Sequence, residues 1–179
     1  MSYLKKLVFC AACVALCVVL PMAFHTIQNA GNIFLPMHIP VILCGLIWGW
    51  PFGMGCGILG PLLSSVLTGM PKVAILPSMM VECAVYGCVT GLMMRLVQTK
   101  KPWLDLYISM LTAMVCGRVL AGLAKSLIFS PRTAPFAWVG TSLVTGIPGI
   151  CIQLVLIPLI VAALTKAKLI PHRNKTAAK

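Results

Sequence analysis

Residues 136–164 read FAWVGTSLVTGIPGICIQLVLIPLIVAAL, an apolar run that contains no Asp, Glu, Lys or Arg. A helix that crosses the hydrocarbon core of a bilayer needs about 20 consecutive, mostly apolar residues, and this run is longer. It contains Gly146-Ile147-Pro148-Gly149 and Pro158, so we expect the helix to be tilted or kinked. The run predicts a membrane-spanning helix.

Further apolar segments precede this run, and Pro, Gly and charged residues separate them. We expect helices at about 4–24, 37–50, 55–68, 77–97 and 104–129. Pro51-Phe52-Gly53 is predicted to form a tight turn between the second and third helices. Both of these helices are near or below spanning length, so at least one is expected to be broken or partly re-entrant.

The composition agrees with a membrane protein. Hydrophobic residues make up 60% of the 179 residues and charged residues only 9%, whereas about a quarter of the residues in soluble domains are charged. The mean hydropathy is +1.04. The predicted fold is therefore an all-α membrane protein, with a single bundle of six transmembrane helices in residues 1–165 and a basic tail in residues 166–179.

The first apolar segment could be mistaken for a cleaved signal peptide, because Lys5 and Lys6 precede it. It is long for the apolar region of a signal peptide, and further hydrophobic segments follow. We therefore expect it to be the first transmembrane helix.

The formal net charge of +12 does not indicate nucleic acid, because the basic residues lie at the ends and in the loops rather than on one amphipathic face. Cytoplasmic loops of membrane proteins are enriched in Lys and Arg. With the N-terminus inside, the outer side has only Lys72 and Arg132. The cytoplasmic side then collects Lys5, Lys6, Arg95, Lys100, Lys101, Lys166, Lys168, Arg173, Lys175 and Lys179. Both termini are thus predicted to be cytoplasmic.

Glu82, Arg118 and Lys125 lie within predicted transmembrane helices. A charge at the centre of a bilayer costs at least about 2.5–3.5 kcal/mol, so such residues usually pair or line a functional cavity. In one interpretation, Glu82 forms an ion pair with one cation that fixes helix packing, and Lys125 extends to the interface. In the other, one acid cannot neutralise two cations, and Arg118 holds a carboxylate of an anionic substrate with two hydrogen bonds.

Other polar residues are candidates for the same site. They are Gln153, Thr145, His38 at the start of the second helix, and Asn32 in the connection before it. Each also has a structural interpretation, because a lone histidine is often a hydrogen-bonded core residue and a loop asparagine is often only solvated. Because they are polar residues in or next to predicted transmembrane helices, we nevertheless expect them to contribute to a substrate site together with Glu82.

No metal site, cofactor or catalytic residue is predicted. The nine cysteines lie in apolar runs without clustered histidines, which is typical of buried free thiols. A polytopic membrane enzyme would need paired acids, a His/Glu metal cluster or a Ser/His dyad, and His25, His38 and His172 are scattered. A channel or stand-alone secondary carrier normally has a repeat that relates two halves, and we find none. The enzyme and the secondary carrier remain the alternatives.

Helix 4–24 presents the small residues Ala11 and Ala15, four positions apart. Small residues at this spacing allow another helix to approach closely. They predict either a contact with a neighbouring helix of this chain or a docking face for a partner.

The order of several motifs resembles a known family. The stretch at 38–53 reads HIPVILCGLIWGWPFG, and GPLLS and LTGMP follow at 60–64 and 67–71. VECAVYG, GRV and IPGICIQLVLIP then occur at 81–87, 117–119 and 147–158. Over nearly the whole chain, these motifs resemble the S components of energy-coupling factor (ECF) vitamin transporters. They are most similar to the subgroup of pantothenate carriers and related carriers of pyridoxine or pyrimidine precursors, in which Asn often stands at the position of Thr145.

The resemblance implies a substrate-binding subunit in the bacterial plasma membrane, with a small-molecule site toward the extracellular side. It also implies a transmembrane coupling subunit and two cytoplasmic ATPases as partners, with Ala11 and Ala15 facing the coupling subunit. The S component would topple in the membrane to carry its ligand. This chain has no phosphate-binding loop of the Gly-x-x-x-x-Gly-Lys-Ser/Thr type, so ATP hydrolysis would belong to a partner. Arg118 and Lys125 favour a carboxylate ligand such as pantothenate over neutral pyridoxine.

Overall fold

The computed structural model describes residues 3–23, 34–99, 101–126 and 135–170, without the side chains of 135–138. These residues form helices and no strands. The helices are α1 (Tyr3–Ala23), α3 (His38–Trp48), α4 (Trp50–Thr68), α5 (Leu76–Leu96), α6 (Pro102–Ala124) and α7 (Pro135–Lys166). The prediction of an all-α protein is confirmed for this part of the chain.

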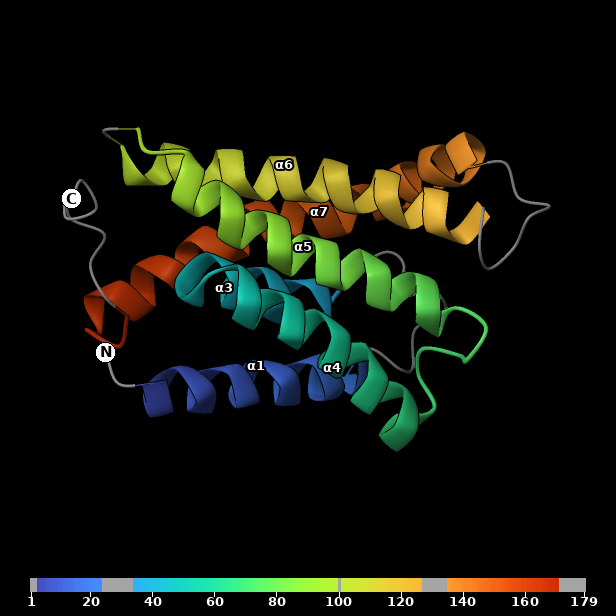
Figure 1. The fold of residues 1–179 in the computed structure, drawn as a ribbon, viewed down its shortest axis with the longest axis horizontal. Helices are drawn as coiled ribbons and strands as arrows, with labels where there is room; N and C mark the ends of the chain where they lie inside the picture. The colour runs from blue at the N-terminus through green and yellow to red at the C-terminus, as the bar shows by residue number, and fades with distance from the viewer. Residues whose placement is uncertain (1–2, 24–33, 100, 127–134, 171–179) are drawn as a thin grey trace.

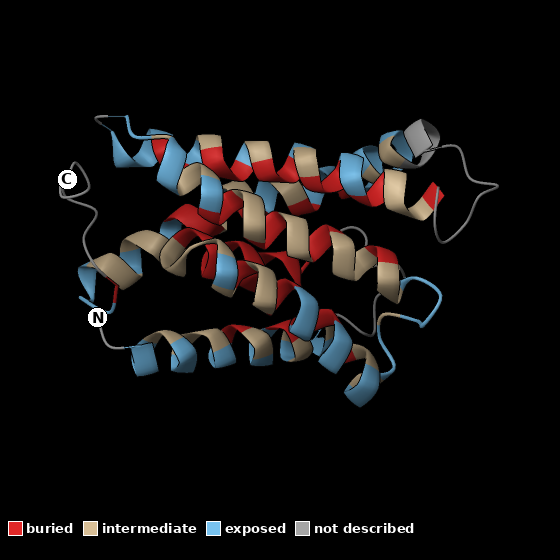
Figure 2. Ribbon diagram, in the orientation of Figure 1, coloured by how far each residue is buried: buried red, intermediate tan, exposed pale blue. Residues whose placement is uncertain are grey.

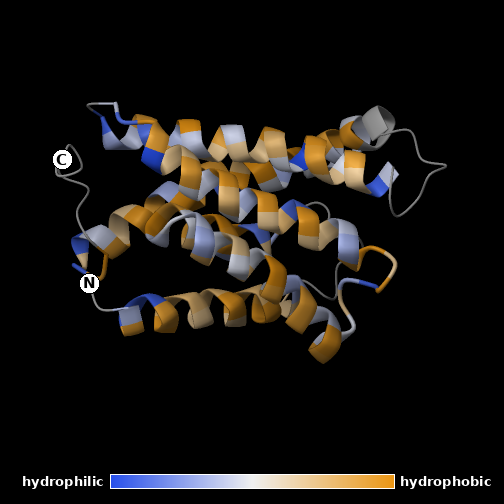
Figure 3. Ribbon diagram, viewed as in Figure 1, coloured by the Kyte–Doolittle hydropathy of each residue, from blue (hydrophilic) through white to orange (hydrophobic). Residues whose placement is uncertain are grey.

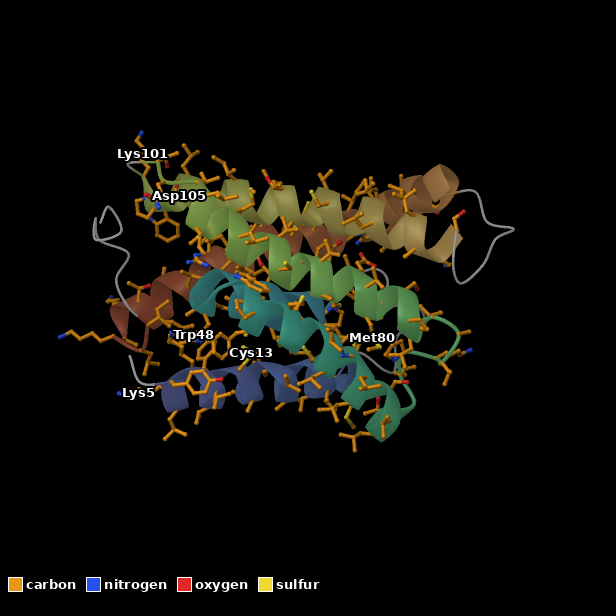
Figure 4. All side chains as sticks on the ribbon, in the orientation of Figure 1. Lys5, Cys13, Trp48, Met80, Lys101 and Asp105 are labelled. Atoms are coloured by element: carbon orange, nitrogen blue, oxygen red, sulfur yellow. The ribbon has the colours of Figure 1, made fainter. Side chains whose placement is uncertain are left out.

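Successive helices run in alternating directions, so that α1 begins and α7 ends at the same end of the bundle (Figure 1). We call this the basic end, because Lys5, Arg95, Lys101 and Lys166 lie where α1, α5, α6 and α7 begin or end there. Figure 4 shows Lys5 and Lys101 at this end. Lys72, between α4 and α5, lies at the opposite end. The placement of these charges agrees with the asymmetry expected from the sequence.

Within the described residues, five helices are long and apolar enough to cross a membrane, and α3 is shorter. With 11 residues, α3 spans about 17 Å, roughly half of the hydrocarbon core. The second predicted helix is thus short, as expected, but the third is not, because α4 has 19 residues. Five helices, rather than the predicted six, have the length of a complete span in the described part of the chain.

The predicted turn at Pro51-Phe52-Gly53 is wrong, because these residues form the first turn of α4. The chain instead breaks at Gly49, which has a φ of 91° and separates α3 from α4. A left-handed φ costs glycine little, and a proline is tolerated in the first helical turn because the amide there lacks a helical partner. Gly49 therefore turns the chain, and Pro51 starts the next helix.

The later helices lie close to their predicted bounds. Residues 76–96 form α5 and α6 begins at residue 102, while the predicted end of that helix at 127–129 lies outside the described residues. In α7, the helix continues through Gly146, Gly149 and both internal prolines. Figure 1 shows α7 running obliquely behind α6, in line with the expected tilt.

Very close contacts between backbones hold α3, α4 and α5 together. A Cβ atom on Gly87 would overlap the backbone of Gly53, and a Cβ on Gly45 would overlap the carbonyl of Gly87. Small residues of this kind allow transmembrane helices to pack closely when lipid supplies no hydrophobic driving force. The three helices therefore form the centre of the bundle, where Figure 2 shows most of the buried residues.

The outer surface of the bundle is apolar. Val66, Val115 and Val155 are more than half exposed, and Figure 3 shows hydrophobic residues along the length of every helix. Such a surface is unfavourable in water and suits contact with lipid chains. The chain is a membrane protein whose interior nevertheless holds the polar side chains of Glu82, Arg118 and Gln153.

Candidate functional site

Four helices contribute to one polar cluster inside the apolar bundle. His38 comes from α3, Glu82 and Tyr86 from α5, Arg118 from α6 and Ser142 from α7. Glu82 and Tyr86 are four residues apart and therefore lie on the same face of α5. His38, Glu82, Tyr86 and Arg118 are all at least nine-tenths buried. We call these five residues the polar cluster.

Glu82 is the centre of the polar cluster. Its Oε1 atom accepts a hydrogen bond from the Tyr86 hydroxyl at 2.9 Å and lies 3.1 Å from Nε of Arg118. Nε2 of His38 is 3.6 Å from the same oxygen, too far for a good hydrogen bond. The ion pair of Glu82 is thus with Arg118, which neutralises the acid inside the bundle.

The guanidinium of Arg118 is held at two of its three nitrogen atoms. Nε also donates to the Tyr86 hydroxyl at 3.0 Å, and Nη1 donates to the backbone carbonyl of Ser142 at 2.8 Å and to its hydroxyl. Nη2 is buried without a hydrogen-bond partner among the described residues. A Cβ on Gly146 would lie 2.9 Å from Nη2, so the glycine leaves room for this nitrogen. Nη2 is therefore the guanidinium nitrogen of Arg118 that has no hydrogen-bond partner in the described part of the chain.

His38 is the second group with unsatisfied nitrogen atoms. Only 1% of the residue is exposed, and neither Nδ1 nor Nε2 has a hydrogen-bond partner among the described residues. Its ring lies 4.9 Å from that of Tyr86. A buried polar atom without a partner costs about 1–3 kcal/mol. The polar cluster thus holds three buried nitrogen atoms, two in His38 and one in Arg118, that have no hydrogen-bond partner in the part of the chain that the structure describes.

The local sequence explains how Tyr86 fits into this region. Gly117 directly precedes Arg118, and a Cβ on Gly117 would overlap the Tyr86 ring. Glycine therefore permits the ring of α5 to reach the backbone of α6, which brings the phenol beside the guanidinium. The motif Gly117-Arg118 provides both the space and the cation.

The polar cluster lies toward the end of the bundle opposite the basic end. Glu82 follows the start of α5 by six residues, and Arg118 precedes the end of α6 by six, which places each about 9 Å inside the bundle. His38 is the first residue of α3. The chain's other acidic residue, Asp105, lies at the basic end and accepts a hydrogen bond from the Thr99 amide at 2.8 Å. Glu82 is therefore the acid available to this site.

The predicted site residues have different outcomes. Gln153 is buried and donates to the Leu35 carbonyl at 3.4 Å, which also accepts from the His38 amide at 3.1 Å. Leu35 thus connects Gln153 to the polar cluster. Thr145 does not join it, because its side chain is exposed and its hydroxyl donates to Thr141 of the same helix at 2.8 Å.

Lys125 and Asn32 are not placed in the polar cluster. Lys125 is half-buried and directly follows α6, seven residues or about 10 Å beyond Arg118. Asn32 lies outside the described residues. Of the two cations considered from the sequence, Arg118 is the one that pairs with Glu82.

Sequence reasoning missed Tyr86 and Ser142. The spacing of Glu82 and Tyr86 is a signal that could have suggested Tyr86, because residues four apart meet on a helix. Ser142 gave no such signal, since its carbonyl binds Arg118 through tertiary packing. Among the described residues, no group of three or more His, Cys, Asp or Glu side chains could hold a metal ion.

Comparison with known protein families gives a match over most of the chain. The family model described as "ECF transporter, substrate-specific component" matches residues 5–161. No curated protein and no solved structure matches this chain. The matched range includes every residue of the polar cluster.

Proposed function

We propose that this chain, which belongs to the family of ECF transporter substrate-specific components, captures a vitamin or vitamin precursor at the polar cluster. The family match makes the chain the substrate-specific membrane subunit of such a transporter. The ligand, the partners and the residues that bind the ligand are parts of the proposal.

One observation supports the polar cluster as the binding site. Nη2 of Arg118 and both ring nitrogens of His38 are buried without hydrogen-bond partners in the described residues, beside Glu82, whose Oε1 accepts from Tyr86 and pairs with Nε of Arg118. A group that served only to hold helices together would lose stability through such atoms. A ligand with hydrogen-bonding groups would satisfy them, as in small-molecule sites where a few polar groups fix orientation in apolar surroundings.

Our best candidate for the ligand is pantothenate. Its carboxylate would accept from Nη2 of Arg118, and its hydroxyl and amide groups would meet His38 and Gln153. Pyridoxine is the second candidate, because it is neutral and the charge of Arg118 is already paired with Glu82. The site's position opposite the basic end supports capture from outside the cell, provided that the basic end is cytoplasmic.

The proposed partners are a transmembrane coupling subunit and two cytoplasmic ATPases, in a bacterial plasma membrane. The outward face of α1 supports this, because Ala11 and Ala15 are exposed, whereas Cys13 and Cys17 on the opposite face are buried. A partner helix could approach closely at these two alanines. We infer that they form the docking face.

Transport assays distinguish this proposal from its alternatives. The purified chain in proteoliposomes is expected to bind labelled pantothenate but to accumulate it only with the coupling and ATPase subunits and ATP. Net uptake by the chain alone would instead indicate a secondary carrier. Chemical conversion of the bound ligand by the chain would indicate a membrane enzyme.

A pair of variants tests the assignment of the site. Arg118→Ala is expected to weaken binding about 10- to 100-fold, the effect of losing a hydrogen bond from a charged group. Lys125→Ala, at the residue that directly follows α6, is the control and is expected to have a smaller effect. Equal, negligible effects of both changes in a binding titration would overturn the site.

A further inference from the structure

Tyr86 contacts both residues of the polar cluster, His38 and Arg118, that have nitrogen atoms without a partner among the described residues. Its hydroxyl donates to Glu82 at 2.9 Å and accepts from Nε of Arg118 at 3.0 Å, while its ring lies 4.9 Å from the His38 ring. The ring also lies against Gly117, where a Cβ would overlap it. With 2% exposure, the side chain is fixed by α3, α5 and α6 at once.

The phenol determines which nitrogen of Arg118 is available. A guanidinium is planar and rigid, so holding two of its nitrogens fixes the direction of the third. Tyr86 and Glu82 hold Nε, and Ser142 holds Nη1. Nη2 lies beside Nε on the same edge of the guanidinium and has no partner among the described residues.

The same hydroxyl weakens the interaction between the Glu82 carboxylate and the Arg118 guanidinium. Its O–H occupies part of the acceptor capacity of the carboxylate. Without that donor, Glu82 would draw more of the guanidinium to itself, since charge-assisted hydrogen bonds are the strongest available in this region. Glu82 would then accept from Nε and Nη2 together, and Nη2 would no longer be available to a ligand.

We propose that Tyr86 is a positioning residue that sets the preference of the site for an acidic ligand over a neutral one. The inference rests on the proposed function, because it assigns the ligand to the polar cluster. Tyr86 acts through Arg118: it orients Nη2 toward the carboxylate and limits the competition from Glu82. A neutral ligand gains less from this orientation, because its bond to Nη2 lacks the second charge.

The test compares pantothenate with panthenol, in which a hydroxyl replaces the carboxylate. Binding of each to the purified full chain is measured by isothermal titration in detergent. Tyr86→Phe removes the hydroxyl but keeps the ring against Gly117. It is expected to weaken pantothenate binding about tenfold and panthenol binding at most about twofold, so the ratio of the two affinities falls.

Two further variants complete the design. Tyr107→Phe makes the same chemical change on α6, at a residue that is 38% exposed, and is expected to leave the ratio unchanged. Gly117→Ala displaces the Tyr86 ring through its new Cβ and is expected to lower the ratio in the same direction. It tests the inference even if Tyr86→Phe does not fold.

The outcomes separate this inference from the proposed function. If the wild-type chain binds pantothenate and Tyr86→Phe weakens both ligands equally, the hydroxyl is structural and the inference is overturned. An unchanged ratio in Gly117→Ala, with pantothenate still bound, would also overturn it. If the well-folded wild-type chain binds neither ligand, the proposed capture of pantothenate fails, and the inference fails with it.

Discussion

Removing the charge of Glu82 should destabilise the bundle strongly. In Glu82→Gln, the amide oxygen can still accept from Tyr86, but the buried charge of Arg118 loses its counterion at 3.1 Å. Breaking a buried pair by removing one partner costs about 3–5 kcal/mol, and an unpaired charge at membrane depth costs about 2.5–3.5 kcal/mol. We expect the free energy of unfolding to fall by about 3 kcal/mol.

Removing the charge of Arg118 should lower the free energy of unfolding by less than removing the charge of Glu82. Arg118→Gln leaves Glu82 without its cation, but a carboxylate can take up a proton and become neutral, whereas a guanidinium keeps its charge. We therefore expect the free energy of unfolding to fall less in Arg118→Gln than in Glu82→Gln. The double variant leaves no buried charge at this site, so its loss should be at least about 2 kcal/mol smaller than the sum of the two single losses.

Reversible unfolding in mixed micelles can measure this cycle, with the fluorescence of the four tryptophans as the signal. The wild type, both single variants and the double variant are compared without ligand. If the two losses add to within about 0.5 kcal/mol, Glu82 and Arg118 do not interact, and the reasoning about the polar cluster is refuted.

Three further changes test other parts of the structure. Ala15→Trp should leave ligand binding unchanged but block uptake by the complete transporter, because a bulky residue prevents close approach at the exposed face of α1; normal uptake would exclude this face as the docking surface. Gly87→Val should lower the yield of folded, binding-competent protein, because its side chain would overlap the backbone of α4; wild-type thermal stability would contradict the close contact. In a chain that retains only Cys10 and Cys44, whose sulfurs lie 3.2 Å apart, mild oxidation should link α1 to α3. A chain that retains only Cys10 and Cys116 should not be linked, and equal linkage of both pairs would contradict this packing.

The sequence was sufficient to predict the helical membrane fold, and it offered the pairing of Glu82 with a cation as one of two interpretations. Long apolar runs have few alternatives in a bilayer, because the backbone must satisfy its own hydrogen bonds. A single acid inside such runs requires a partner, which limited the choice to Arg118 or Lys125. The structure selects Arg118.

The remaining details depend on tertiary packing. The boundary between α3 and α4 was misplaced because Pro51 and Gly53 are typical of turns, whereas the positive φ lies at Gly49. Thr145 lies outside the polar cluster, because a threonine in a helix can satisfy its hydroxyl within its own helix, as it does here. Tyr86 could not be distinguished from a packing residue until its contacts across helices were known.

The most direct test of the account is an isothermal titration of the purified, detergent-solubilised chain against pantothenate, pyridoxine, hydroxymethylpyrimidine, folate and riboflavin, each tested separately. The titration is repeated with Arg118→Ala for any ligand that binds. The account predicts tight binding of one ligand, with pantothenate as the best candidate, and a loss of about 10- to 100-fold in the variant. Absence of binding by well-folded wild-type chain, or equal binding by the variant, would contradict ligand capture at the polar cluster.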